Sequence, residues 1–281
     1  MKIAFWSGEE QVGTTFNLAA VACTAVLMHP VSIAVIPGGY QDEGLQKQFY
    51  AEKKGYPIRT KKKEEVQRKE LVAEQETFFV STGLDYLLCK EKQELTEKMI
   101  KENMHPVIRD KMYCMPCGRR QYHDWWNTGN LFKKMEEVTD ALESCFDLVF
   151  VDCGNRRDDF SQKMLQEAEV CVLNMEQEEE QIGDYFRNRP KLKGKVFFMV
   201  GNYFENSAYT RKNLQRIYRI EEQQIGIIPY NAQLQTAGGT GKTGKYMNSY
   251  LEHGGTGKNL EFEKEIVRDA QLILKLAGAV K

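Results

Sequence analysis

Short apolar runs alternate with amphipathic segments almost from one end of the sequence to the other. The runs have the length of buried strands and lie at residues 3–7, 31–36, 112–115, 148–152, 170–173, 196–200 and 225–228. Apolar side chains recur at helical spacing in residues 131–144, 160–168, 178–186, 208–217 and 260–277. Buried strands separated by helices form a parallel sheet covered on both faces. The sequence therefore predicts a doubly wound, mainly parallel α/β fold, whose ligands bind beyond the carboxyl ends of the strands.

Length and charge limit the class of protein. The 281 residues fit one large α/β domain, and no linker-like stretch divides them, so we expect residues 1–281 to form a single domain. The net charge of −1 argues against a strongly basic nucleic-acid binder. No apolar stretch approaches about 18 residues and no signal peptide is recognisable. With seven scattered cysteines that fit reduced thiols, we expect a soluble, cytoplasmic protein that does not bind DNA.

Residues 48–76 break the alternation, because they have little apolar content and a basic run between residues 59 and 69. We predict that this segment is an insertion on the sheet. The interleaved Glu64, Glu65 and Glu70 favour a solvated, salt-bridged helix. A basic patch for DNA or an anionic partner is the alternative.

The loop after the first apolar run has the frame of a phosphate-binding loop. Residues 7–15 read SGEEQVGTT and precede a helix-like segment at 17–27. A loop of the form GxxxxGK[ST] cradles phosphates with backbone N–H groups, a lysine, and a Ser/Thr hydroxyl that binds Mg²⁺. Gly8, Gly13 and Thr15 keep their places, but Thr14 stands where the lysine belongs. The sequence predicts a phosphate-binding loop without its positive charge.

This loop resembles the deviant Walker A motif SGKGGVGKTT of the ParA/MinD family of ATPases, to which it aligns without a gap. Glu9 then replaces the signature lysine of the family, Glu10 and Gln11 replace two glycines, and Phe16 replaces the second threonine. The resemblance implies a P-loop NTPase fold and a site for ATP with Mg²⁺. The loop residues that it assigns to this site are Gly8, Glu9, Gln11, Val12, Gly13, Thr14, Thr15 and Phe16.

The resemblance extends over most of the chain outside the insertion. Residues 146–154, FDLVFVDCG, resemble the Walker B strand YDLVIVDTP, which implies that Asp152 and Thr15 hold the Mg²⁺. Residues 196–203, VFFMVGNY, and 226–230, GIIPY, resemble the family's passages that contact the base. This implies that Asn202 and Pro229 line an adenine site, with Asn231 in place of the usual acid.

Three groups that the chemistry needs are missing. Besides both lysines, the acidic motif LIDLDPQ after the second strand is lost, with Val35 and Pro37 where its two aspartates fall. Two lysines lost and two acids gained shift the local charge by about four units, and each misplaced charge at about 6 Å costs roughly 2 to 3 kcal/mol at an effective dielectric near 20. Phosphoryl transfer depends on such charge stabilisation. We therefore expect a pseudo-ATPase, with hydrolysis weak or absent.

Two functions are compatible with this pattern. The first is a degenerate ParA/MinD-like protein that acts by association with protein partners, as part of the localisation or assembly of a cellular machine. Among branches with degenerate loops it is most similar to the TadZ/CpaE group, which localises pilus-assembly machinery, without the receiver-like domain usual there. The alternative is an active partition or localisation switch that forms a homodimer on binding ATP, with its charges supplied from elsewhere.

Three other motifs have alternative interpretations. Residues 237–245, AGGTGKTGK, are interpreted as a flexible glycine-rich loop, or as a second loop whose Lys242 or Lys245 supplies the missing charge. Cys114 and Cys117 have redox-pair spacing but span a predicted strand end, which does not favour a depressed thiol pKa. The last helix has an apolar stripe and several acids, and is expected to pack on the domain rather than to bind a membrane.

Overall fold

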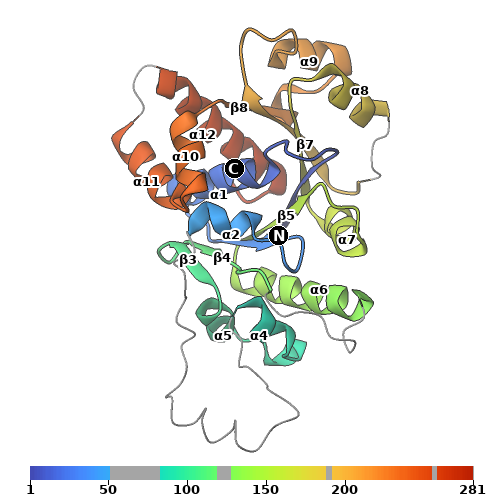
Figure 1. The fold of residues 1–281 in the computed structure, drawn as a ribbon, viewed down its shortest axis with the longest axis vertical. Coiled ribbons are helices and arrows are strands. Elements are labelled where there is room, and N and C mark those ends of the chain that lie inside the picture. The colour runs from blue at the N-terminus through green and yellow to red at the C-terminus, as the bar shows by residue number, and fades with distance from the viewer. Residues whose placement is uncertain (51–82, 119–127, 188–191, 255–257, 281) are drawn as a thin grey trace, which may run out of the picture.

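A computed structural model describes residues 1–50, 83–118, 128–187, 192–254 and 258–280. Within them, one sheet of eight strands has the order β3-β4-β2-β5-β1-β6-β7-β8 (Figure 1). All neighbouring strands are parallel except β3, which runs antiparallel to β4. The predicted mainly parallel α/β fold is confirmed. The strands are β1 (Lys2–Ser7), β2 (Ile33–Pro37), β3 (His105–Ile108), β4 (Met112–Cys114), β5 (Leu148–Gly154), β6 (Val170–Met175), β7 (Lys195–Tyr203) and β8 (Ile225–Pro229).

The seven strands expected from apolar runs are present, whereas β3 was missed. Its sequence, HPVI, contains Pro106 and its side chains are only partly buried, so it forms no apolar run. The expected helices are also present. The helices are α1 (Thr14–Met28), α2 (Gly44–Phe49), α4 (Leu84–Leu88), α5 (Glu97–Glu102), α6 (Thr128–Cys145), α7 (Asp159–Glu167), α8 (Glu179–Arg187), α9 (Arg211–Tyr218), α10 (Ala232–Gly239), α11 (Thr243–His253) and α12 (Lys258–Ala277), with short 3-10 turns at Lys92–Glu94 and Glu222–Gln224.

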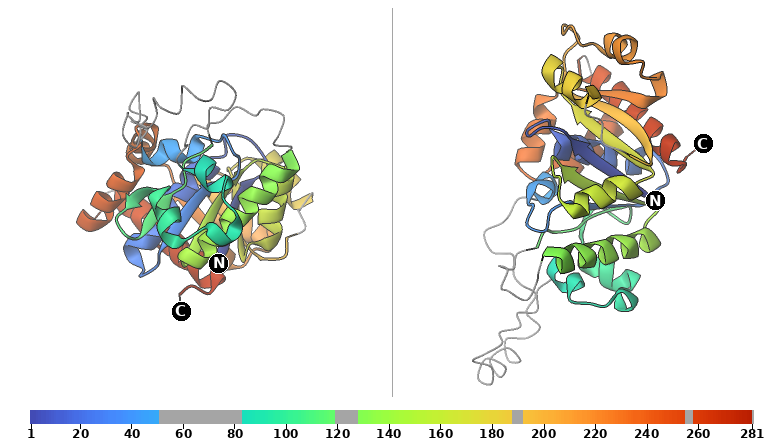
Figure 2. Two further views of the ribbon diagram at one scale, coloured as in Figure 1. Left: turned by 90° about the horizontal axis from the view of Figure 1, so that it is seen from below. Right: turned by 90° about the vertical axis from the view of Figure 1, so that its right-hand side faces the viewer.

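Two apolar cores lie on opposite faces of the sheet. In β1, Ile3 and Phe5 belong to the core under α1, α2, α10, α11 and α12, whereas Ala4 and Trp6 belong to the core under α4 to α9. This alternation follows from the period of two residues in a strand. Because helices cover both faces, the sheet lies in the middle of the molecule (Figure 2). The helices leave the carboxyl ends of the strands uncovered, and a ligand can reach the backbone there.

The last helix packs on the domain, as expected. On α12, Phe262, Ile266, Ala270 and Ile273 are buried, and the helix contacts α1 and β8. Its apolar stripe is therefore used inside the fold. No helix in the described part of the chain is long and apolar enough to cross a membrane.

The interpretation of residues 237–245 as a flexible glycine-rich loop is wrong, because they belong largely to α10 and α11. The side chain of Asn231 caps α10 by accepting a hydrogen bond from the Leu234 N–H. The glycines allow close packing: a Cβ atom on Gly238 would lie 2.4 Å from Oε1 of Gln48, and one on Gly244 would lie 2.7 Å from a Val107 methyl.

The structure does not pair the lysines of this segment with the loop after β1. Lys242 and Lys245 are exposed, and in the described part of the chain neither makes a hydrogen bond or ion pair with residues 7–15. Most of the predicted insertion, residues 51–76, lies outside the described residues, and only its first residues belong to α2 and the position after it.

Candidate functional site

The loop between β1 and α1 turns sharply at two left-handed residues. Gln11 has a φ of 61° and Gly13 a φ of 77°. The Ser7 hydroxyl shares its one proton between the carbonyl oxygen of Glu9, at 2.7 Å, and the more distant one of Gly154, at 3.4 Å. The loop is therefore held both to itself and to the end of β5.

The loop side chains divide into exposed and buried ones. Glu9, Glu10 and Gln11 are exposed, whereas Val12 is buried and Phe16 packs partly against the core. Gly8 lies half-buried beside the Trp6 ring. The structure thus places the two acids on the solvent side of the loop.

The first turn of α1 offers free backbone N–H groups. Gly13, at its N-cap, provides no side-chain hydrogen bond, and no acidic residue lies in the first turn. Thr14 is 6% exposed, and its Oγ1 has no hydrogen-bond partner among the described residues. Uncapped N–H groups at the positive end of a helix are suited to an anion.

Thr15 and Asp152 meet, as the Walker motifs imply. The Thr15 hydroxyl lies close enough to the Asp152 carboxylate to lower its pKa, and the Gly154 N–H donates to Asp152 Oδ1 at 3.2 Å. Asp152 is 2% exposed, and burial raises the pKa of its carboxyl to about 6, against the opposing effect of Thr15.

These oxygens fit a magnesium ion only together with ligand oxygens. In the described residues no three His, Cys, Asp or Glu side chains are grouped to hold a metal. Mg²⁺ usually takes one or two protein carboxylates and completes its shell with phosphate and water. Thr15 and Asp152 would hold it here, and it would neutralise phosphate charge.

Two charged residues that sequence reasoning missed also lie in this cluster. Asp42, in the loop between β2 and α2, accepts a hydrogen bond from the Gly44 N–H at 2.9 Å and forms an ion pair with Arg156, whose Nη2 lies 3.0 Å from Oδ2. The charge of Asp42 raises the pKa of Asp152, and that of Arg156 lowers it. The acid after the second strand was sought at Val35 and Pro37, which are buried in β2. In the sequence, Asp42 could have been found as the first carboxylate after β2, and Arg156 as the first arginine after the Walker B acid, Asp152.

A buried pair of asparagines fixes the start of α1. Asn17 Nδ2 donates to Asn174 Oδ1 at 2.9 Å, and Asn174 Nδ2 donates to the carbonyl oxygen of Trp6 at 3.3 Å. Gly201 of β7 passes so close that a Cβ atom there would lie 2.8 Å from Asn17 Nδ2. These contacts join α1 to the carboxyl ends of β1 and β6.

Asn202 and Pro229 lie at the same edge of the sheet, on the strands two and three places from β1. Asn202 has a φ of 46°; its amide donates to Glu176 Oε1 at 3.1 Å, and its Oδ1 accepts from Gln235 Nε2 at 3.3 Å. Its side chain is therefore already engaged by the protein.

Two aromatic residues next to these positions were not predicted from the sequence. Phe204 and Tyr230 are 56% and 49% exposed, and their stacked rings have centroids 5.7 Å apart. They directly follow β7 and β8, so the carboxyl ends of the two strands bring them together.

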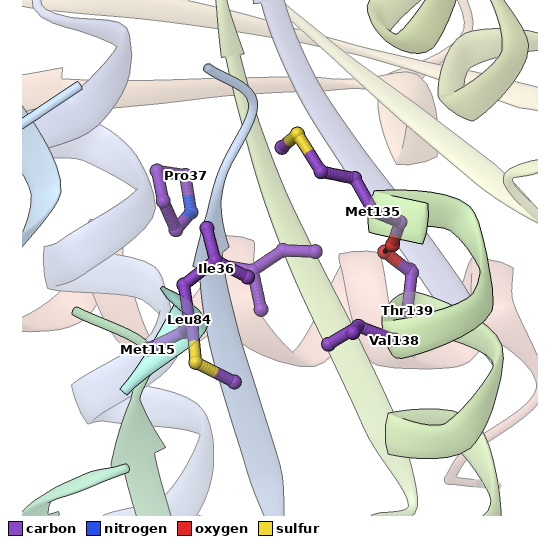
Figure 3. A pocket seen from close by; sticks show the side chains of 7 residues that line it. All are labelled: Ile36, Pro37, Leu84, Met115, Met135, Val138 and Thr139. Atoms are coloured by element: carbon purple, nitrogen blue, oxygen red, sulfur yellow. Dashed lines mark hydrogen bonds between the residues drawn. The ribbon is translucent and has the colours of Figure 1, made fainter. Parts of the chain in front are cut away.

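A small apolar cavity lies under the end of β2, between that strand and α6. Its volume of about 10 Å³ leaves room for about one water molecule. The Thr139 hydroxyl donates to the Met135 carbonyl at 2.8 Å and is not available to a ligand. This cavity is a packing defect rather than a binding site. Figure 3 shows its lining, which is Ile36, Pro37, Leu84, Met115, Met135, Val138 and Thr139.

The cysteine pair does not have the properties of a redox motif. Cys114 and Cys117 are both buried, at the end of β4 and just after it. Burial raises the pKa of the Cys114 thiol well above its usual range. A redox-active thiol needs a depressed pKa.

A strand, a glycine-containing loop and a helix with an uncapped amino end, next to a buried acid that closes the neighbouring strand, define the fold class as a P-loop NTPase α/β fold. No family model matches the chain, and no curated protein matches it.

Solved structures nevertheless match it over almost its whole length. A ParA family ATPase from Chlorobium tepidum has a TM-score of 0.63 at 12% identity, covering 96% of this chain and 97% of that one. The septum site-determining protein MinD of Pyrococcus horikoshii, complexed with Mg-ADP, has a TM-score of 0.61 at 14% identity, covering 99% and 97%. A chain of the MinC:MinD cell division protein complex of Aquifex aeolicus has a TM-score of 0.59 at 16% identity, covering 98% and 95%. The chain thus has the fold of the ParA and MinD ATPases.

Proposed function

We propose that this protein is a degenerate member of the ParA/MinD family, with residues 1–281 forming one domain, and that it acts by association in the localisation or assembly of a cellular machine. The machine that we propose is the pilus-assembly apparatus, by the resemblance to the TadZ/CpaE group. Its partners are proteins, including a second copy of the chain. ATP with Mg²⁺ is the proposed ligand of the loop, bound weakly and hydrolysed slowly or not at all.

The observation that carries the proposal is that the loop between β1 and α1 combines the geometry of a phosphate-binding loop with negatively charged side chains. The start of α1 is uncapped and Thr15 lies beside Asp152, and both features support a cradle for phosphate and Mg²⁺. Its side-chain charges are reversed, because Glu9 and Glu10 are the charged residues of the loop and Thr14 is buried. Retained geometry with reversed charge favours a binding scaffold over a catalyst.

Purified protein should therefore hydrolyse ATP at background rate. No lysine of the loop neutralises the γ-phosphate, and the carboxylate of Asp42 is held by Arg156. The measurement is phosphate release with Mg-ATP, with a ParA enzyme assayed in parallel and Asp152→Ala as the matched variant. A rate within about tenfold of the ParA enzyme that Asp152→Ala abolishes would contradict the proposal, since one unit in log rate is only about 1.4 kcal/mol of barrier.

The second candidate is an ATP-dependent switch, which is favoured by the intact contact between Thr15 and Asp152. The two candidates differ in their dimers. In the family that this chain resembles, the signature lysine reaches the phosphates of the partner subunit, so Glu9 would there oppose an anion. We therefore expect self-association to be independent of Mg-ATP, or stronger after Glu9→Gln and Glu10→Gln.

Sedimentation with and without Mg-ATP decides between them. Equal sedimentation in both conditions supports the scaffold. A monomer that becomes a dimer only when Mg-ATP is added would instead establish the switch. Glu43→Gln removes an exposed acid outside the loop and serves as the control for a general change in charge.

A further inference from the structure

We propose that Arg156 is the phosphate-recognising cation of this site and that Asp42 is its intramolecular counter-ion, which an anionic ligand must displace. This inference rests on the proposed nucleotide site and says which residue gives the degenerate loop its affinity for phosphate.

The backbone of Arg156 is fixed beside the loop. Its N–H donates to the Cys153 carbonyl at 3.0 Å, and its carbonyl accepts a hydrogen bond from the buried Trp6 indole at 3.0 Å. The adjacent Asn155 amide lies 3.5 Å from Glu10 Oε1. The segment after β5 therefore lies beside the loop after β1, and hydrogen bonds hold the backbone from which the guanidinium extends.

The side chain of Arg156 lies across the loop after β2. A Cβ atom on Gly39 would lie 2.3 Å from the guanidinium carbon, so the glycine lets the side chain take this position. One nitrogen reaches Asp42, and 37% of the Arg156 side chain remains exposed. The guanidinium is thus in van der Waals contact on one side and open to solvent on another.

One hydrogen bond, one close approach and one electrostatic effect place this ion pair beside Thr15 and Asp152. The Gly38 N–H donates to the Asp152 carbonyl at 2.7 Å, which joins the loop after β2 to the end of β5. A Cβ atom on Gly44 would lie 3.7 Å from the Thr15 hydroxyl. Arg156 also lowers the pKa of Asp152, whereas Asp42 raises it. Thr15, Asp152 and the ion pair therefore form one cluster.

A guanidinium suits this position chemically. Arginine binds phosphate through two parallel N–H···O bonds, and it keeps its charge at every working pH. The exposed acids of the loop repel an anion, so a cation opposite them is what allows the uncapped N–H groups of α1 to act. Because the Asp42 side chain is 29% exposed, the ion pair is partly hydrated and can exchange one anion for another.

The test is calorimetric binding of ATP, and of inorganic tripolyphosphate, to the full chain in EDTA. Leaving out Mg²⁺ separates the counter-ion role of Asp42 from a role in holding metal. Asp42→Asn keeps the oxygen that accepts from the Gly44 N–H and frees the guanidinium, so ATP affinity should rise about fivefold to tenfold. Arg156→Gln should lower it about tenfold, and Arg156→Lys by less, since it keeps the charge but not the two parallel bonds.

Matched variants control for charge and folding. Glu43→Gln and Arg157→Gln make the same charge changes one residue further along the chain and should alter affinity by less than about twofold. Thermal unfolding of each variant shows that it is folded, and Arg156→Lys replaces Arg156→Gln if the latter is not.

Each failure has a distinct meaning. The assignment of Arg156 would be overturned by any of three results. ATP affinity does not rise with Asp42→Asn, Arg157→Gln lowers ATP affinity as much as Arg156→Gln does, or no variant binds either anion. None of these binding results depends on turnover. Rapid hydrolysis of Mg-ATP would therefore contradict the proposed function but would not change what the binding measurements say about Arg156.

Discussion

Protein in which Glu9 and Thr14 are both replaced by lysine should bind Mg-ATP about 100-fold more tightly than the wild-type chain. Each substitution places a positive charge within about 6 Å of a triphosphate, where a charge is worth roughly 2 to 3 kcal/mol before screening. Glu9 is exposed, so solvent reduces its share, whereas Thr14 is buried beside the uncapped start of α1. A gain of about 2.7 kcal/mol in total corresponds to about 100-fold.

Calorimetry on the wild type, both single variants and the double variant measures this gain. The two substitutions act on one triphosphate, so their effects should not be additive. Glu10→Lys makes the charge change of Glu9→Lys at the next residue and should give a smaller gain, since its side chain lies toward Asn155. Unchanged or weaker binding by the double variant would show that the geometry of the loop, and not its charge, has been lost.

Turnover should rise much less than affinity in the same double variant. The resemblance assigns the positioning of water to an acid after β2, and Asp42 is paired with Arg156 there. Binding energy that is equal in the ground state and the transition state lowers the dissociation constant without raising the rate.

The strands of this fold were predictable because parallel strands are buried on both faces. Residues 148–152 are an uninterrupted apolar run that ends in Asp152, and the structure has β5 there with all but its last residue buried. The short antiparallel strand β3 gave no such signal, since it lies at an edge and carries Pro106. A strand can be predicted from an apolar run only where its side chains are buried, and the side chains of β3 are not fully buried.

The glycines of α10 and α11 led to the wrong prediction of a flexible loop, because their role depends on residues far away in the sequence. Gly238 and Gly244 were interpreted as flexible, but they make room for side chains from elsewhere in the chain, Gln48 and Val107. A glycine that makes room for a distant neighbour has the same local sequence as one in a loop. Only the tertiary packing separates the two cases.

The candidate site was predictable where one segment determines it and not where two segments meet. Ser7 to Thr15 form a single turn, so the positions of Gly13 and Thr15 followed from the motif. The pair Asp42 and Arg156 is separated by 114 residues and depends on the order of β2 and β5 in the sheet. A motif aligned position by position could not find it.

One buried acid should dominate the pH dependence of stability. Asp269 of α12 is completely buried against β8, and a Cβ atom on Gly226 would lie 2.3 Å from its carboxylate. Arg268 donates to Oδ1 at 3.0 Å, whereas Oδ2 has no hydrogen-bond partner among the described residues. Burial raises the pKa of this carboxyl to about 8, against the opposing charge of Arg268.

Because the folded protein holds this proton up to about pH 8 and the unfolded chain releases it near pH 4, stability should fall as pH rises through that window. The loss between about pH 5 and about pH 8 should be roughly 3 kcal/mol. Asp269→Asn should remove this fall, because an amide of the same shape has no proton to release. Urea unfolding of both proteins across the window measures the difference, and Glu261→Gln, an exposed acid of the same helix, is the control. An Asp269→Asn curve parallel to that of the wild type would show that Arg268 keeps the carboxylate ionised inside the fold.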